Sequence, residues 1–221
     1  MDDRTGTIGP QTNKSGVPRL IGLTGQYCAG KNYVAGLLEA RGIPVLDVDK
    51  LGHRALEEEK EAILSRFGAD ILTPEGTVNR RLLGSRVFAD PQALKDLEAI
   101  VHPRANQLTE TWIAGRTEPV LAINAALLHR SAFFSRLSCI IIVQAGLLTR
   151  LIRAKQRDRL PLRTLLQRFN SQTQFNAQYF QQNADTYVVK NRGVTGICAR
   201  RHRYHLERQL DAILRREGIG Q

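Results

Sequence analysis

The segment from Gly25 to Asn32 carries the clearest chemistry in this 221-residue chain. It reads Gly-Gln-Tyr-Cys-Ala-Gly-Lys-Asn, so a lysine directly follows the second of two glycines. An apolar run precedes the segment and an apolar-periodic stretch, residues 33–38, follows it. We therefore predict a strand, a glycine loop and a helix in that order. This order is typical of a phosphate-binding loop, or P-loop.

The chemistry of such a loop comes from its backbone and from one cation. Gly25 and Gly30 permit backbone angles that other residues avoid, so several N–H groups can turn inward around a phosphate. The helix expected from Lys31 adds the positive end of its dipole, and the Lys31 ammonium can reach the β- and γ-oxygens of a nucleotide. A structural turn that merely needs glycines is the alternative. The predicted nucleotide contacts are Gly25, Cys28, Ala29, Gly30, Lys31, Asn32 and Tyr33.

Asn32 is the one departure within the motif, because a serine or threonine at this position would offer a hydroxyl to Mg²⁺. The asparagine keeps a carbonyl oxygen, which is a competent ligand for a hard cation. We predict Asn32 as the metal residue, with Mg²⁺ binding weakened or mediated by water.

Bulk properties restrict the class of protein. The net charge of +11 favours acidic partners such as nucleotides, nucleic acid or anionic lipid. The three cysteines are widely spaced, which excludes a disulfide framework and suggests a reducing cytoplasm. Cys28 either fills space in the loop or, beside Lys31, forms a thiolate. No apolar run approaches the length of a membrane span, and residues 1–18 are expected to be a disordered extension without a secretory signal.

Strand and helix patterns alternate along the chain, which predicts an α/β protein with a five-stranded parallel sheet. Asp90 with Pro91 is a typical helix start. Residues 156–182 are expected to form two short polar helices. The strands are expected at 20–24, 42–46, 119–123, 138–143 and 186–189, and the longer helices at 51–67, 80–88, 91–113, 147–155 and 194–216.

The chain resembles the dephospho-CoA kinase family over about residues 20–214. The resemblance is carried by the P-loop, Gly42–Asp49, Gly76, Arg81, Phe88, Pro91, His102-Pro103, Leu127-Leu128, Gln156-Arg157-Asp158 and Asn191. It implies a three-layer P-loop kinase domain over residues 19–221, with a helical acceptor-binding region at about 68–116 and a lid at about 156–183. It also implies ATP-dependent phosphorylation of the 3′-hydroxyl of dephospho-CoA with Mg²⁺, by a monomer or weak homo-oligomer.

The same resemblance implies three catalytic residues. Lys31 would hold the phosphates, Asp49 would accept the proton of the acceptor hydroxyl or orient it, and Arg157 would offset charge on the transferring group. Asn32, together with Asp47 through water, would hold Mg²⁺. Strand alternation would send Asp47 and Asp49 to the same face, so that one could orient the other. Structural alternatives stay open: Asp49 as a helix cap and Arg157 as an exposed ion pair with Asp158.

The clearest departures from the family pattern follow the third strand. Ala126 replaces a proline and Arg130 replaces an acidic residue, which reverses the local charge. Two other functions stay open: a nucleotide-binding regulator without turnover, and a kinase for another nucleoside or nucleotide. Arg80-Arg81 and the basic cluster at 200–203 either bind anions or form a solvated surface. Nucleic-acid binding is not expected, because no basic platform is interleaved with aromatic residues.

Overall fold

A computed structural model of the chain describes residues 17–158, 161–170, 179, 184–193 and 199–219. The chain forms two compact units, one of Met1–Val45 with Thr117–Gln221 and one of Leu46–Arg116. The N-terminal extension expected at residues 1–18 lies outside the described residues as far as residue 16.

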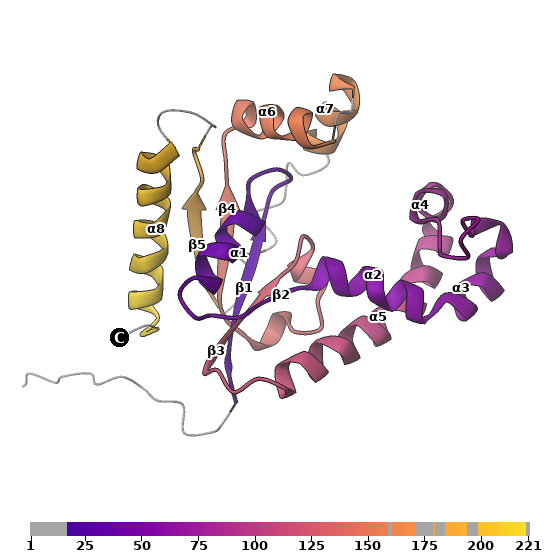
Figure 1. The fold of residues 1–221 in the computed structure, drawn as a ribbon, viewed down its shortest axis with the longest axis horizontal. Coiled ribbons are helices and arrows are strands. Elements are labelled where there is room, and N and C mark those ends of the chain that lie inside the picture. Colours follow the sequence, from indigo (N-terminus) through magenta and orange to yellow (C-terminus); the bar gives the residue numbers. More distant parts are fainter. Residues whose placement is uncertain (1–16, 159–160, 171–178, 180–183, 194–198, 220–221) are drawn as a thin grey trace, which may run out of the picture. The chain divides into compact units, whose positions relative to one another are not determined.

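The chain contains one five-stranded sheet, whose strand order is β2-β3-β1-β4-β5 (Figure 1); four of its strands belong to the first unit, and β2 crosses the boundary between the units. β1 pairs in parallel with β3 and β4, and β4 pairs in parallel with β5, so the predicted five-stranded parallel α/β fold is confirmed. The strands are β1 (Arg19–Gly25), β2 (Val45–Asp47), β3 (Val120–Asn124), β4 (Leu137–Gln144) and β5 (Asp185–Lys190).

The helices of the first unit are α1 (Lys31–Glu39), α6 (Leu147–Asp158), α7 (Leu162–Asn170) and α8 (Ala199–Arg216), with short 3₁₀ turns η2 (Leu128–Arg130) and η3 (Phe134–Arg136). The second unit contains α2 (Val48–Glu58), α3 (Lys60–Phe67), η1 (Ala69–Ile71), α4 (Arg80–Ala89) and α5 (Pro91–Ala114).

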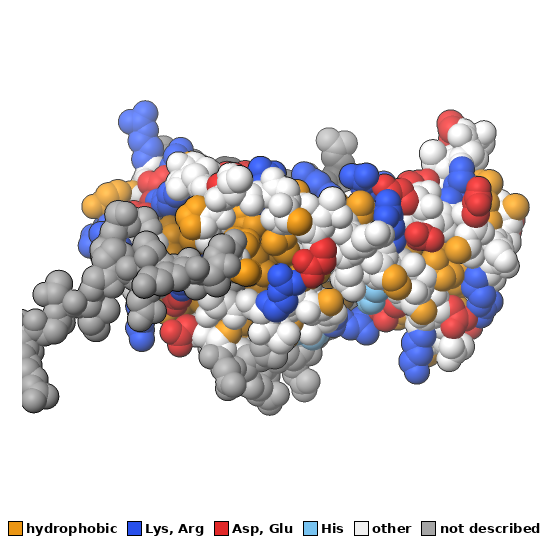
Figure 2. Space-filling view, turned by 90° about the horizontal axis from the view of Figure 1, so that it is seen from below, with side chains coloured by type: hydrophobic (Ala, Val, Ile, Leu, Met, Phe, Trp, Pro, Cys, Tyr) orange, Lys and Arg blue, Asp and Glu red, His pale blue; other side chains and the backbone are white. Residues whose placement is uncertain are grey.

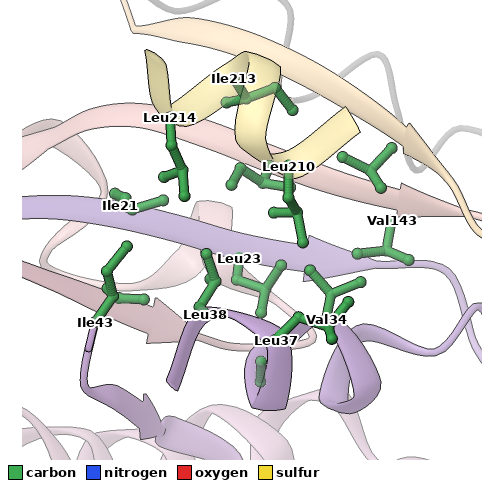
Figure 3. Close-up of a cluster of buried hydrophobic side chains, with 14 of the residues drawn as sticks. Ile21, Leu23, Val34, Leu37, Leu38, Ile43, Val143, Leu210, Ile213 and Leu214 are labelled. Atoms are coloured by element: carbon green, nitrogen blue, oxygen red, sulfur yellow. The ribbon is translucent and has the colours of Figure 1, made fainter. Parts of the chain in front are cut away.

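One hydrophobic cluster explains how the sheet holds the first unit together (Figure 3). Ile21 and Leu23 of β1 lie between apolar residues of α1 and of α8, and all of these side chains are buried. Alternation along β1 sends these two residues to one face, so α1 and α8 cover the same face of the sheet. The P-loop therefore joins a buried strand to a helix that is anchored on that strand's own face.

The register of the parallel strands brings their carboxyl ends to one edge of the sheet. Leu23 of β1 is aligned with Asn124 of β3, and Gly25 is aligned with Val143 of β4. The loop that follows β1 thus begins beside the last residues of both neighbouring strands. Ligands of open parallel sheets bind at this edge.

Two helix predictions need correction. The run expected as one helix over residues 51–67 is two helices, because the chain turns at Glu59, with φ −95° and ψ 18°. The predicted lid motif, residues 156–158, belongs to the end of α6, and one following helix, α7, is described. Most of the rest of the predicted lid, and the expected helix start at 194–198, lie outside the described residues.

The second unit has a core of its own, formed by apolar side chains from α3, η1, α4 and α5. Asp90 caps α5 as predicted, since its carboxylate accepts a hydrogen bond from the Gln92 N–H at 2.8 Å, and Pro91 occupies the first turn.

The net charge does not gather on the face drawn in Figure 2, where basic and acidic side chains are mixed. Among the described residues, no helix combines the length and the apolar character needed to cross a bilayer.

Candidate nucleotide-binding site

The P-loop turns between Gly25, where β1 ends, and Lys31, where α1 begins. Gly30 has φ +96°, as predicted for a position that only glycine adopts readily. Gly25 is needed for a different reason from the one predicted: a Cβ there would lie 2.8 Å from the Val143 carbonyl oxygen. The second left-handed position is Cys28, at φ +58°, which the sequence pattern did not indicate.

Side chains from α6 and from the end of β5 hold the outer carbonyls of this loop. Arg153 Nη1 donates to the Ala29 oxygen at 2.9 Å and to the Cys28 oxygen at 3.3 Å. Asn191 Nδ2 donates to the same Ala29 oxygen at 2.9 Å. Because a trans peptide is planar, a carbonyl fixed on one side directs the next N–H, that of Gly30, to the opposite side. We call Arg153 and Asn191 the carbonyl clamp.

Two of the predicted amide contacts are engaged inside the loop. The Ala29 N–H donates to the Gln26 oxygen at 2.9 Å, and the Tyr33 N–H donates to the Gly30 oxygen at 3.1 Å. Their contacts to a nucleotide stay predictions. The first N–H groups of α1 have no acceptor within the helix, which makes this end suited to an anion.

Lys31 and Asn32 are joined through a residue that the motif does not contain. Lys31 Nζ donates to Asn124 Oδ1 at 3.0 Å, and Asn124 Nδ2 donates to Asn32 Oδ1 at 3.2 Å. Asn124 is buried at the end of β3. It orients both polar side chains at the start of α1 with the two ends of one amide. The sequence offers one sign of this role: Asn124 is a polar residue at the end of an apolar strand.

Asn32 offers one carbonyl oxygen, a ligand of the kind that Mg²⁺ accepts. Among the described residues, no group of three or more His, Cys, Asp or Glu side chains could hold a metal. Mg²⁺ commonly keeps several waters and binds substrate phosphates with few protein ligands. The donor set therefore fits a cation held mainly by phosphate and water, with Asn32 as the protein contact.

Arg157, at the end of α6, lies against the P-loop. Its Nε atom pairs with Asp158 Oδ1 at 2.7 Å, and its guanidinium carbon lies 5.0 Å from the centre of the Tyr27 ring. The Tyr27 hydroxyl in turn donates to Asp158. The Asp158 hydrogen bond raises the pKa of Arg157, which is exposed and remains cationic. The ion pair considered from the sequence is present, and the catalytic role stays a prediction.

Arg150 ties the same helix to the loop and to α7. It is buried, donates from Nε to the Tyr27 oxygen at 2.8 Å, and lies 4.6 Å from the centre of the Phe169 ring. Burial lowers the pKa of Arg150 and of Arg153. Arg150, Arg153 and Arg157 recur at helical spacing, so they form one stripe on α6. Of these three arginines the family resemblance indicates only Arg157, although their helical spacing is itself visible in the sequence.

The two alternatives for Cys28 can now be separated. Burial raises the pKa of its thiol, and the nearby cations Arg157, Arg150 and Arg153 oppose this only in part. This direction does not favour a thiolate, and Cys28 packs against the cluster of Ala154, Leu165 and Phe169, as expected for a space-filling residue.

Asp47 and Asp49 belong to different structural contexts. Asp47 caps α2, because its carboxylate accepts a hydrogen bond from the Lys50 N–H at 3.3 Å. Asp49 lies within the first turn of α2 and is exposed, so neither the capping alternative nor strand alternation applies to it. An acidic residue in this turn also interacts favourably with the helix dipole.

The second unit also contains a shallow cavity of about 640 Å³ that is widely open to solvent. Arg80 and Arg81 contribute two positive charges to its wall, beside hydroxyl and amide groups that can donate hydrogen bonds. The described residues that line it are His53, Thr73, Thr77, Val78, Asn79, Arg80 and Arg81.

Comparison with known proteins gives a consistent result. The profile of a family described as Dephospho-CoA kinase matches residues 19–195. A dephospho-CoA kinase of Treponema denticola is 35% identical over 79% of this chain and 82% of its own length. One of Thermus thermophilus is 33% identical over 89% of this chain and 91% of its own.

Solved structures agree on the fold. The structure of TT1252 from Thermus thermophilus has a TM-score of 0.75 and 33% identity, and the match covers 90% of this chain and 98% of that one. A dephospho-CoA kinase from Campylobacter jejuni has a TM-score of 0.58 at 21% identity, covering 89% and 97% of the two chains, and supports the fold alone.

Proposed function

This chain belongs to the dephospho-CoA kinase family, which catalyses the final step of coenzyme A biosynthesis, and we propose how its residues divide the transfer of a phosphoryl group from ATP to the 3′-hydroxyl of dephospho-CoA. Phosphoryl transfer requires little covalent chemistry; it requires alignment of the reactants and neutralisation of charge. The observation that carries the proposal is the P-loop, with its outer carbonyls clamped and Lys31 held at its end.

The first task is to hold the triphosphate. The Gly30 N–H, directed away from the carbonyl clamp, and the start of α1 would receive the β-phosphate. The Lys31 ammonium, which donates to Asn124 at 3.0 Å, would extend to the β- and γ-oxygens. Asn124 limits the positions of that ammonium, so less conformational entropy is lost when ATP binds.

The second task is to offset the charge that develops on the transferring group. Bound Mg²⁺ would neutralise charge on the β- and γ-oxygens, with Asn32 as its protein contact. Arg157 would exchange its bond to Asp158 for the phosphoryl oxygens, and its planar guanidinium suits bidentate contact with phosphate. In the absence of nucleotide, Asp158 and Tyr27 would hold Arg157 beside the P-loop.

The third task is to bind and activate the acceptor. Asp49 would accept the proton of the 3′-hydroxyl or orient that hydroxyl. The cavity that contains Arg80 and Arg81 has a size suited to a small ligand, and we assign it to the diphosphate part of the acceptor.

Asp49→Asn tests this division of labour. Loss of a general base costs 10²- to 10⁴-fold in turnover, so we expect a fall in kcat of about that size with ATP affinity changed less than about threefold. Asp90→Asn is the matched control, since asparagine also caps helices well. An equal loss of kcat and ATP affinity, or a loss of folded protein, would assign Asp49 a structural role.

We further propose that the enzyme acts in the cytoplasm, as its few and widely spaced cysteines suggest, and as a monomer or weak homo-oligomer. Light scattering coupled to size-exclusion chromatography tests the second part: a stable dimer at micromolar concentration would contradict it.

A further inference from the structure

A second basic cavity, of about 470 Å³, lies between the end of β5 and the N-terminal half of α8. It contains none of the P-loop residues, and its walls come from the chain after β5 and from one face of α8. The described residues that line it are Lys190, Arg192, Arg201, His202, His205 and Gln209.

Gln209 fixes one wall of this cavity. Its Oε1 atom accepts the Lys190 N–H at 2.9 Å, and its Nε2 atom donates to the Lys190 oxygen at 3.3 Å and the His205 oxygen at 3.2 Å. The polar atoms of this amide are therefore engaged with backbone. The side chains that remain available to a ligand are the cations of Lys190, Arg192 and Arg201 and the imidazole rings of the two histidines.

The charge of this lining is not balanced locally. No carboxylate is among the described residues that line the cavity, and no ion pair joins Lys190, Arg192 or Arg201 to another described residue. His202 Nδ1 is buried and has no hydrogen-bond partner within the described part of the chain. A buried polar atom without a partner is costly, so its partner is expected to be a ligand or water.

We propose that this cavity is a second anion site, which takes a small soluble polyphosphate. Three fixed positive charges match a multiply charged anion, and the two guanidinium groups suit phosphate oxygens. The cavity volume lies in the range of small-ligand sites. A concave pocket of this size favours a compact anion over an extended nucleic-acid backbone, which needs a groove.

The cavity contains no P-loop residue, but Lys190 and Arg192 also line a neighbouring pocket that includes Gln26 of the P-loop. A Cβ on Gly193 would lie 3.6 Å from the His202 Cβ, so His202 packs beside Gly193. The Gly193 oxygen accepts a hydrogen bond from Arg153 Nη2 at 2.5 Å. Binding at the two places must therefore be measured separately.

Inorganic pyrophosphate is the probe, used with full-length protein labelled with ¹⁵N-histidine. We expect saturable shifts of the His202 and His205 imidazole signals, with His102 of the second unit unaffected. The same shifts are expected in Lys31→Ala, because that residue belongs to the P-loop. The result is thus independent of whether the chain turns over ATP.

Arg201→Gln and its matched control decide the assignment. Removing one charged contact to phosphate is expected to weaken pyrophosphate binding at these histidines at least tenfold. Arg215→Gln removes the same charge from the other end of α8 and is expected to change binding less than twofold. Arg201 is exposed, so its substitution is not expected to affect folding, and Arg192→Gln provides a second variant.

Three results would overturn the proposal. The histidine signals could stay unshifted at saturating pyrophosphate, which would show that the anion does not bind in this cavity. Arg201→Gln and Arg215→Gln could weaken binding equally, which would indicate diffuse attraction to a basic protein. Adenosine, which has no phosphate, could produce the same shifts as pyrophosphate, which would make the cavity a nucleobase site.

Discussion

At the scale of single residues, Asn124 is the side chain that completes the site. One amide accepts a hydrogen bond from Lys31 and donates one to Asn32. Its burial at the end of β3 means that these two bonds satisfy its polar atoms where solvent is excluded. The residue therefore sets the positions of the two P-loop side chains with the greatest chemical importance.

Two substitutions separate the contacts of Asn124. Asn124→Asp keeps an acceptor for Lys31 but loses the donor to Asn32, and its charge would bind the ammonium more strongly. We expect the KM for ATP to rise about tenfold or more, since a charged hydrogen bond contributes roughly 1.5–3 kcal/mol. Asn124→Ala removes both contacts and should lower kcat as well. Steady-state kinetics with ATP varied measures both effects.

Ser138→Ala is the control for these variants. The Ser138 hydroxyl also makes a hydrogen bond between neighbouring strands, since it donates from β4 to the Leu20 oxygen of β1 at 3.1 Å, but it lies at the end of β1 opposite to the P-loop. Kinetic constants for Asn124→Asp equal to those of the wild type would contradict the role given to Asn124.

At the scale of elements, α6 acts on the P-loop through its arginine stripe. Arg150 and Arg153 bond to loop carbonyls, and Arg157 lies on the Tyr27 ring. The helix is itself attached to α7 through Leu165 and Phe169, which pack with Ala154. A movement of α6 and α7 would therefore shift the P-loop carbonyls to which Arg150 and Arg153 are bonded.

Arg153→Gln tests whether the clamp orients the loop. Loss of the charged contacts to Ala29 and Cys28 should weaken ATP affinity about tenfold, with a smaller effect on kcat, because Asn191 alone then fixes the peptide that directs the Gly30 N–H. Lys155→Gln removes a charge from an exposed position of the same helix and should change affinity less than twofold. Isothermal titration with a non-hydrolysable ATP analogue gives the comparison; equal affinities for the two variants would contradict the clamp.

The elements also show what the sequence could predict. The apolar runs predict the bounds of β1, β3, β4 and β5 to within one residue, because buried parallel strands are continuous apolar runs. The break at Glu59 was missed, since the run contains no proline there. The bond from Lys31 to Asn124 spans 93 residues and depends on the pairing of β1 with β3. Patterns within a short stretch of sequence cannot predict contacts between residues so far apart in the chain.

At the scale of the whole molecule, stability should depend on pH through His129. Its ring lies 5.5 Å from that of Tyr179, and its Nδ1 atom is 3.1 Å from the Tyr179 hydroxyl. Burial, with the charge of Arg130, lowers the pKa of His129 below its ordinary value of 6.5. The unfolded chain then binds the proton first, so this contribution to stability is complete above about pH 6.5 and is lost as the pH falls through the folded pKa.

His129→Gln should therefore lose less stability than the wild type between pH 7.5 and pH 5.5, as measured by urea unfolding. His102→Gln, at an exposed position of α5, should follow the wild-type curve. If His129→Gln and the wild type show the same loss over this interval, His129 is not responsible for it.

The central claim is that Lys31 and the clamped P-loop direct the γ-phosphate of ATP to the 3′-hydroxyl of dephospho-CoA. A single-turnover reaction with enzyme in excess over γ-³²P-labelled ATP, followed by identification of the phosphorylated product, tests it most directly. We predict label on the 3′-oxygen of coenzyme A for the wild type and none for Lys31→Ala. Bound ATP without labelled coenzyme A in the wild type, or equal labelling by Lys31→Ala, would contradict the account.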